Sequence, residues 1–194
     1  MTPVIFVVFP PGSGGNHLRN MIVSLLGKDR EIDLLYTKKN MRVHAKTGPN
    51  LQLENIQNAI DHPDGVHVLH GHFGEIMSYR DQIRSITNKK FVVLSLNTAD
   101  DRKLLNQRCR HLNYPHAFLD ENYFNFEQVF LYESFMYHLY FQVPMEHIIS
   151  ISITEWLARD IDTVLDRLSW LLCVNINKTD IARMHCLWLE DNNL

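Results

Sequence analysis

The chain has 194 residues, of which 45% are hydrophobic and 21% charged, the composition of a globular protein with one well-buried core. Its net charge of −3 at pH 7 argues against a surface for nucleic acid or anionic membranes, and no apolar stretch approaches the roughly 20 residues of a membrane-spanning helix. Three well-separated cysteines without metal-binding spacing suit a reducing cytoplasm. We therefore expect a single cytoplasmic domain over residues 1–194, with neither nucleic acid nor a membrane as partner.

A strand, a glycine-rich turn and a helix are expected at the beginning of the chain. Residues 4–9 form a continuous apolar run, as in a strand buried on both faces, and from Leu18 the apolar side chains repeat with the period of a helix. The turn between them holds the first group of candidate ligand-binding residues, Gly12, Ser13, Gly14, Gly15, Asn16 and His17. Three glycines exceed what a tight connection needs, and they leave backbone N–H groups at a helix N-terminus open to an anion. The turn therefore predicts a phosphate-binding site.

Two common phosphate-binding patterns do not fit this turn. A nucleotide-hydrolysing P-loop, G-x-x-x-x-G-K-[ST], would need glycine and lysine at His17 and Leu18, and a dinucleotide-binding G-x-G-x-x-G would need glycine at His17. The turn instead resembles the 5′-phosphosulfate loop of the sulfotransferase family, P-K-S-G-T-T-W-L. Pro11, Ser13, Gly14 and Leu18 coincide with that motif.

Two positions of the turn depart from the sulfotransferase motif. Gly12 stands where the family has its lysine, and His17 stands where it has the tryptophan that stacks near the adenine. The resemblance implies that Ser13 and the backbone N–H groups of the turn hold the 5′-phosphate of the donor. It also implies a three-layer, P-loop NTPase-like α/β fold, with a parallel sheet and helices on both faces.

A second strand is expected over residues 66–69, followed by a helix over 75–86. The strand leads into His70-Gly71-His72-Phe73, which lies in the place of the sulfotransferase segment K-T-H-L-P. The histidine of that segment is the catalytic base of the family, and the resemblance assigns this role to His72. The alternative is an ordinary structural histidine at the end of a strand.

A third buried strand is expected over residues 91–96, and Thr98 or Asp100 after it can cap a helix. This place resembles the family motif R-N-P-x-D-x-x-x-S, whose arginine and serine bind the 3′-phosphate of the donor. Asn97 and Asp100 match the motif, and Leu96 stands at its arginine. The cations that follow and could substitute are Arg102, Arg108 and Arg110, of which Arg102 is the candidate chosen with Asn97 for cofactor binding.

The second half of the chain adds a strand and three helices. They are expected over residues 147–153 for the strand, and over 126–141, 160–173 and 178–191 for the helices. Glu155 and Leu157 match the sulfotransferase segment Y-E-D-L, and His185 and Trp188 are expected to be packing residues. The polar segment 28–50 is expected to be a solvated loop or a segment that closes over the ligand. Strands that alternate with helices predict a parallel α/β sheet with the ligand at the carboxyl ends of its strands.

The leading functional hypothesis is a transferase that resembles the sulfotransferases. By resemblance the donor is 3′-phosphoadenosine 5′-phosphosulfate, the acceptor is a hydroxyl or amine of a small molecule or glycan, His72 is the general base, and no metal is needed. Two alternatives stay open. One is a catalytically inactive interaction protein that keeps the fold. The other is a P-loop nucleotide or nucleoside kinase, although the P-loop lysine and an acidic residue ending the 91–96 strand are missing.

Overall fold

The computed structural model describes residues 3–26, 51–65, 67–112, 130–192 and 194 of the chain. The segment 28–50 discussed above and residues 126–129 of the helix predicted over 126–141 lie outside these residues. Four strands form the sheet, β1 (Val4–Val8), β2 (His67–Gly71), β3 (Lys89–Ser95) and β4 (Ile148–Ser152). All neighbouring strands are parallel, in the order β2-β1-β3-β4. The predicted α/β class with a parallel sheet is confirmed.

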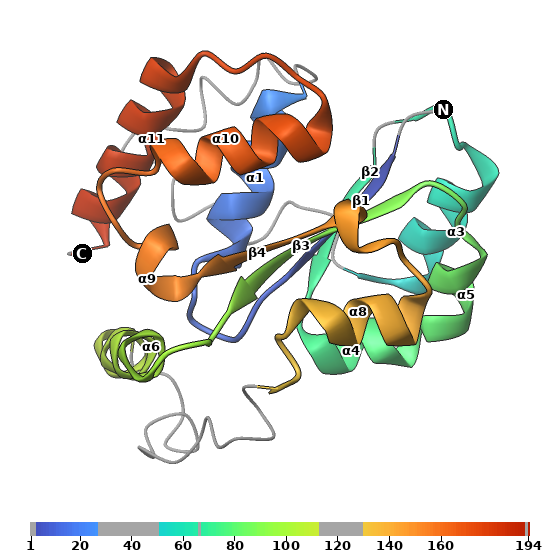
Figure 1. Cartoon of the computed structure of the whole chain (residues 1–194), viewed down its shortest axis with the longest axis horizontal. Coiled ribbons are helices and arrows are strands. Elements are labelled where there is room, and N and C mark those ends of the chain that lie inside the picture. Colours follow the sequence, from blue (N-terminus) through green and yellow to red (C-terminus); the bar gives the residue numbers. More distant parts are fainter. Residues whose placement is uncertain (1–2, 27–50, 66, 113–129, 193) are drawn as a thin grey trace.

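Helices lie over both faces of this sheet. The described helices are α1 (Gly15–Leu25), α3 (Leu53–Asp61), α4 (Phe73–Ser78), α5 (Arg80–Ser85), α6 (Ala99–His111), α8 (Ser134–Phe141), α9 (Ile153–Trp156), α10 (Asp162–Leu172) and α11 (Lys178–Asp191), with a 3-10 turn η3 (Met145–His147). Helices α1 and α10 lie above the sheet in Figure 1, and α4 and α8 lie below it. This cover on both faces explains why β1 is buried along its whole length.

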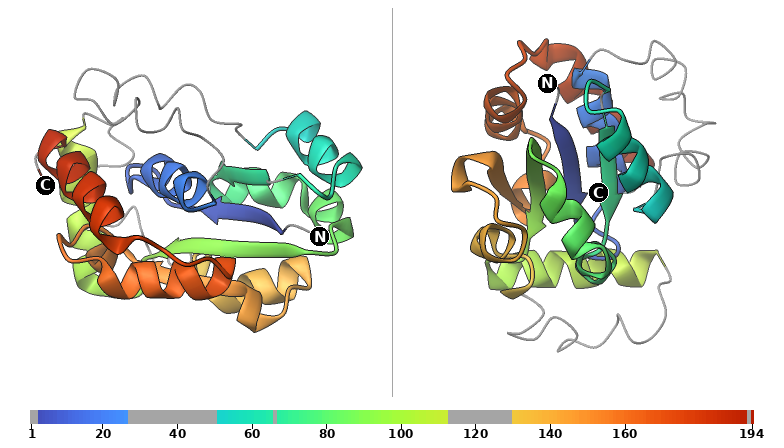
Figure 2. Two further views of the ribbon diagram at one scale, coloured as in Figure 1. Left: turned by 90° about the horizontal axis from the view of Figure 1, so that it is seen from above. Right: turned by 90° about the vertical axis from the view of Figure 1, so that its right-hand side faces the viewer.

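The strand order places a possible ligand site between β1 and β3. The chain leaves β1 toward β2 on one side and leaves β3 toward β4 on the other. In open parallel sheets, ligands bind outside the carboxyl ends of the strands where the connections diverge in this way. Helices α6 and α11 lie at this end of the sheet, beside the points of the strand arrows (Figure 2).

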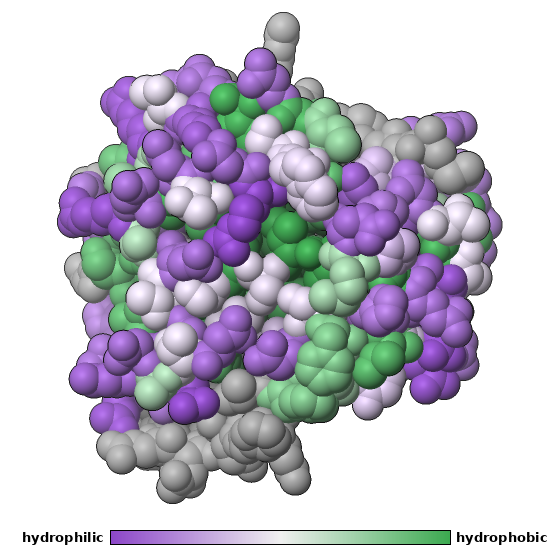
Figure 3. Space-filling view, in the orientation of Figure 1, coloured by the Kyte–Doolittle hydropathy of each residue, from purple (hydrophilic) through white to green (hydrophobic). Residues whose placement is uncertain are grey.

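The buried apolar side chains form one continuous core on both sides of the sheet. Phe6 and Phe91 stack across β1 and β3 with 5.1 Å between ring centroids, and Phe91 also contacts Tyr137 and Phe141 of α8. On the surface that Figure 3 shows, polar side chains prevail and hydrophobic side chains gather over α8. None of the helices in the described ranges combines the length and apolar character needed to cross a bilayer.

Two predicted helices differ from the structure, whereas the helices predicted over 160–173 and 178–191 are reproduced as α10 and α11. The helix predicted over 75–86 is two short helices that meet at Tyr79. The break follows Ser78, whose hydroxyl donates to the carbonyl of Gly74 (2.9 Å) and so competes with the backbone ladder. In the described part of the helix predicted over 126–141, residues 131–133 are not helical and the regular helix begins at Ser134. The predicted last helix coincides with α11.

Candidate functional site

The glycine-rich turn connects β1 to α1. Gly12 and Gly14 have φ angles of 80° and 83°, a left-handed conformation that glycine adopts at little cost. The N–H of Ser13 donates to the carbonyl of Pro10 (3.2 Å) and closes the turn. Gly14 occupies the N-cap position of α1, and no side chain of the described residues caps this helix. Backbone N–H groups in its first turn are therefore directed at the space in front of the helix.

Three buried polar atoms near this turn have no hydrogen-bond partner among the described residues. They are the hydroxyl oxygen of Ser13, Oδ1 of Asn16 and the indole Nε1 of Trp156. Ser13 and Trp156 are both completely buried. A Cβ atom added to Gly14 would lie 3.3 Å from Trp156 Nε1, so the indole N–H lies close to the first turn of α1. Unpaired buried polar groups each cost about 1–3 kcal/mol, and in native proteins they commonly indicate water or a ligand.

Two aromatic rings pack directly on the glycines of the turn. A Cβ atom added to Gly14 would lie 2.5 Å from the ring of Trp188, and one added to Gly15 would lie 2.0 Å from the ring of Phe9. These two glycines therefore have a packing role that is independent of any ligand. Trp188 comes from α11, so the far end of the chain covers the turn near its beginning.

Arg108 of α6 is the cation that the structure places at the turn. Its side chain is only 5% exposed, and its Nε donates to the carbonyl oxygen of Gly12. The guanidinium carbon lies 4.8 Å from the centre of the Trp188 ring, a cation–π contact. Arg102, the candidate chosen from the sequence, lies in the first turn of the same helix and is partly exposed. Asn97 is exposed directly after β3, at the same edge of the sheet.

The rings of His17, Trp156, His185 and Trp188 form a buried cluster next to the turn. His17 lies parallel to Trp188, with 4.3 Å between ring centroids and an interplanar angle of 8°. Its Nε2 lies 3.3 Å from Nδ1 of His185, whose own Nε2 lies 3.0 Å from the carbonyl of Ala158. A carbonyl only accepts, so neutral His185 donates from Nε2 and accepts the proton of His17 at Nδ1. Trp156 completes the cluster at 5.5 Å from His17 and 4.8 Å from His185.

Both histidines of this cluster are held in the neutral form. Burial lowers the pKa of His17 well below its usual value, and the charges of His185 and Arg108 lower it further. Burial also lowers the pKa of His185 to about 4, against the opposing effect of its backbone hydrogen bonds. The side chain of His17 is only 5% exposed, so its ring packs within the cluster and does not face solvent.

His72 lies near the turn and contacts Phe9, the residue whose ring packs on Gly15. It follows β2 as the N-cap residue of α4, where its backbone N–H donates to Glu75 Oε2 (2.8 Å). Its Nδ1 lies 2.8 Å from the carbonyl of Phe9, which directly follows β1. Because this carbonyl accepts the Nδ1 proton, the neutral ring has its lone pair on Nε2. The side chain is partly exposed, and in this tautomer Nε2 can accept a proton, as a general base requires.

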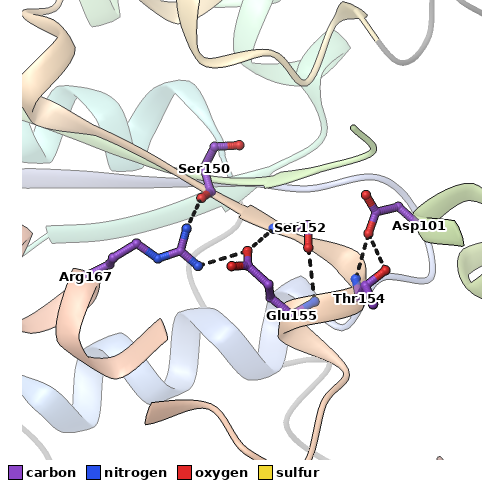
Figure 4. A network of polar contacts seen from close by, with 6 residues as sticks. All are labelled: Asp101, Ser150, Ser152, Thr154, Glu155 and Arg167. Atoms are coloured by element: carbon purple, nitrogen blue, oxygen red, sulfur yellow. Dashed lines mark hydrogen bonds and ion pairs between the residues drawn. The ribbon is translucent and has the colours of Figure 1, made fainter. Parts of the chain in front are cut away.

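A buried carboxylate joins α6 to α9 (Figure 4). Asp101 accepts hydrogen bonds from the N–H of Thr98 (2.9 Å) and from the N–H and hydroxyl of Thr154 (2.8 and 2.6 Å). Thr98 caps α6 in return, one of the two caps that the sequence allowed. Burial alone would raise the pKa of Asp101, but the hydrogen bonds from Thr154 and Thr98 outweigh it and hold the pKa below its ordinary value. This carboxylate fixes the helix that carries Arg108 against the helix that carries Trp156.

A second polar contact anchors α9 to the sheet. Arg167 forms an ion pair with Glu155 (2.9 Å) and donates to the carbonyl of Ser150 in β4 (2.8 Å), and Glu155 accepts from the N–H of Ser152 (2.9 Å) (Figure 4). Hydrogen bonds from Ser152 and the charge of Arg167 overcome partial burial and lower the pKa of Glu155. Glu155, which matches the sulfotransferase motif, therefore has a structural role in α9.

Sequence reasoning named Arg108 among three cations but chose Arg102, and it did not include Trp156 in the site. Arg108 lies on the buried face of α6 with Leu105 and Cys109, but Arg102 falls within the same arc of a helical projection, so the periodicity alone does not separate the two arginines. Cys109 also reaches the turn, with its Sγ 3.6 Å from the carbonyl of Pro11. The neighbouring sequence of Trp156 does not indicate a role in the site, because only the tertiary packing of α9 brings its indole close to Gly14.

Within the described ranges, no group of three or more His, Cys, Asp or Glu side chains is placed to hold a metal ion. No protein-family model, no curated protein and no solved structure matches the chain.

Proposed function

We propose that the chain is a sulfotransferase-like transferase with a three-layer, P-loop NTPase-like fold. It transfers a sulfuryl group from 3′-phosphoadenosine 5′-phosphosulfate to a hydroxyl or amine of a small-molecule or glycan acceptor. The observation that carries the proposal is the uncapped N-terminus of α1, where the buried hydroxyl of Ser13 and the indole N–H of Trp156 have no protein partner in the described ranges. Such a set of donors favours a phosphate group.

The residues of the site divide the work between binding and proton transfer. The N–H groups of the turn and the Ser13 hydroxyl hold the 5′-phosphate and stabilise the negative charge that develops there as the bond to the sulfuryl group breaks. His72 Nε2 takes the proton of the acceptor hydroxyl or amine while the new bond to sulfur forms. The hydrogen bond to the carbonyl of Phe9 fixes the orientation of His72 and supports the imidazolium that results.

A second candidate is a binding protein that keeps this fold without catalysis. The observation in its favour is the packing of Trp188 and Phe9 on Gly14 and Gly15, which places aromatic rings where a ligand would approach the turn. In this case Gly14 and Gly15 are needed to make room for the two aromatic rings, and adenosine phosphates do not bind.

Calorimetric titration with adenosine 3′,5′-bisphosphate, without magnesium, tests the proposal. We expect wild-type protein to bind and Ser13→Ala to bind about tenfold or more weakly, since a hydrogen bond to a charged group contributes about 1.5–3 kcal/mol. Ser24→Ala is the matched control, because Ser24 also has an unpaired buried hydroxyl but lies at the other end of α1. His72→Gln should bind as wild type does and lose sulfuryl transfer in an acceptor screen.

The unliganded stability of the variants separates loss of binding from loss of fold. Ser13→Ala removes an unpaired buried hydroxyl, so its thermal midpoint should equal or exceed that of wild type. No binding by wild-type protein at millimolar ligand would refute the transferase and favour the second candidate. Equal binding by wild type and Ser13→Ala would refute the placement of the phosphate.

A further inference from the structure

We propose that Arg108 and the indole N–H of Trp156 complete the anion site and select a ligand group of high negative charge. This inference rests on the proposed function, since it assigns two further ligand contacts to the same turn. Arg108 lies outside the sulfotransferase motifs that the sequence resembles, and Trp156 stands at the aspartate position of the Y-E-D-L segment.

The position of Arg108 is fixed from two directions. Nε donates to the Gly12 carbonyl, and the guanidinium carbon lies over Trp188, 4.8 Å from the ring centre. The same indole stacks with His17, so its ring contacts both the guanidinium and the imidazole. A cation held in this way is pre-organised and loses little side-chain freedom when it binds an anion.

Trp156 supplies a second, independent observation. Its ring is completely buried, and its Nε1 has no hydrogen-bond partner in the described part of the chain. The same Nε1 lies 3.3 Å from the position of a Cβ on Gly14, at the first turn of α1. Because an indole N–H only donates, the group that satisfies it must be an acceptor.

The chemistry of these contacts defines the ligand class. Arg108 and Trp156 only donate hydrogen bonds, and the N–H groups of the α1 first turn do the same. The positive end of the α1 dipole and the guanidinium charge act in the same direction. The site should therefore bind inorganic pyrophosphate and adenosine 3′,5′-bisphosphate and discriminate against uncharged adenosine.

Titration followed by the indole N–H resonances of ¹⁵N-labelled protein tests this inference. The chain has three tryptophans. Trp170 is 62% exposed on α10 and is the internal reference, and single Phe variants assign the peaks. With pyrophosphate, we expect the Trp156 peak to move and saturate while the Trp170 peak stays. Adenosine should move neither peak.

Arg108→Gln and Lys103→Gln form the matched pair of variants. Both remove one positive charge from α6, but Lys103 is exposed and Arg108 is buried at the turn. Arg108→Gln should weaken pyrophosphate binding about tenfold or more and Lys103→Gln by less than about twofold, because screening reduces the effect of exposed charges. Arg108→Lys keeps the positive charge but lacks the planar guanidinium with its several N–H donors, so it should bind pyrophosphate more tightly than Arg108→Gln and less tightly than wild type. Thermal unfolding of each variant checks that it is folded.

The outcomes separate this inference from the proposed function. Binding of either anion without movement of the Trp156 peak, or with equal affinity in wild type and folded Arg108→Gln, overturns the inference and leaves the transferase intact. Binding of pyrophosphate through Arg108 without binding of adenosine 3′,5′-bisphosphate supports the inference and refutes the sulfotransferase. Binding of neither anion refutes both.

Discussion

Replacement of His185 by glutamine should remove a large part of the acid sensitivity of the fold. His185 is completely buried, and its pKa is lowered to about 4 in the folded chain, against about 6.5 in an unfolded chain. Glutamine is neutral, its amide N–H can donate to the Ala158 carbonyl, and its amide oxygen can accept from His17. His185→Gln thus removes a titrating group and keeps the polar contacts of the ring.

The sign follows from which state takes up the proton. Below about pH 6.5 the unfolded chain protonates His185 while the folded chain resists, so stability is full above this pH and falls as the pH decreases toward about 4. The shift corresponds to about 3 kcal/mol in total, and about 2 kcal/mol of it is lost between pH 7.5 and pH 5. The lowered pKa of His17 acts in the same direction, and its main cause, burial, remains in the variant.

Urea unfolding followed by circular dichroism at pH 7.5 and pH 5 measures this difference. Wild-type protein should lose about 2 kcal/mol more unfolding free energy over this range than His185→Gln. His62→Gln is the control, because it removes a histidine that is exposed in the folded chain and should leave the pH dependence unchanged. Equal losses in wild type and His185→Gln would refute the buried neutral pair.

Two further variants test the packing of the turn and the buried carboxylate. Gly14→Ala should destabilise the fold by about 1–3 kcal/mol in thermal unfolding, because the residue has a left-handed φ and its Cβ would overlap Trp188, whereas Gly74→Ala in open space on α4 should stabilise it by up to about 1 kcal/mol. The opposite order would contradict the close packing. Thr154→Val should cost about 1–3 kcal/mol at pH 7 in urea unfolding, since it removes the hydroxyl that donates to Asp101. The pKa of Asp101 is lowered, so its stabilising contribution is present above about pH 4 and is lost as the pH falls through the folded pKa. The effect of Thr154→Val should therefore be smaller at pH 3, and an equal effect at both pH values would exclude this origin.

The regular elements around the sheet could be predicted from the sequence because their signals are local. The continuous apolar run of β1 and the helical period of α11 need only neighbouring residues to be recognised, and both elements formed as expected. The break at Tyr79 was missed because it lies inside an otherwise helical pattern, where the structure adds a side-chain hydrogen bond from Ser78 to the backbone. Such competition between side chain and backbone has no clear signature in periodicity.

The part of the candidate site that the sequence predicted is also the part with a local signal. The turn with Gly12 and Gly14 was recognised from its own composition, and its left-handed glycines agree with that interpretation. The choice of Arg102 over Arg108 and the omission of Trp156 arose because α6 and α9 meet the turn only through tertiary packing. The role of Trp188 as the cover of Gly14 also depends on such long-range packing.

The contact between Gly14 and Trp188 has a kinetic consequence. Roughly 170 residues of chain lie between the two, and the entropy cost of closing a loop increases with its length. Contacts of such large sequence separation form late in folding, after local helices and neighbouring strands. A ligand at this turn therefore meets its complete site only in the native state, and it should slow unfolding of the protein without accelerating refolding.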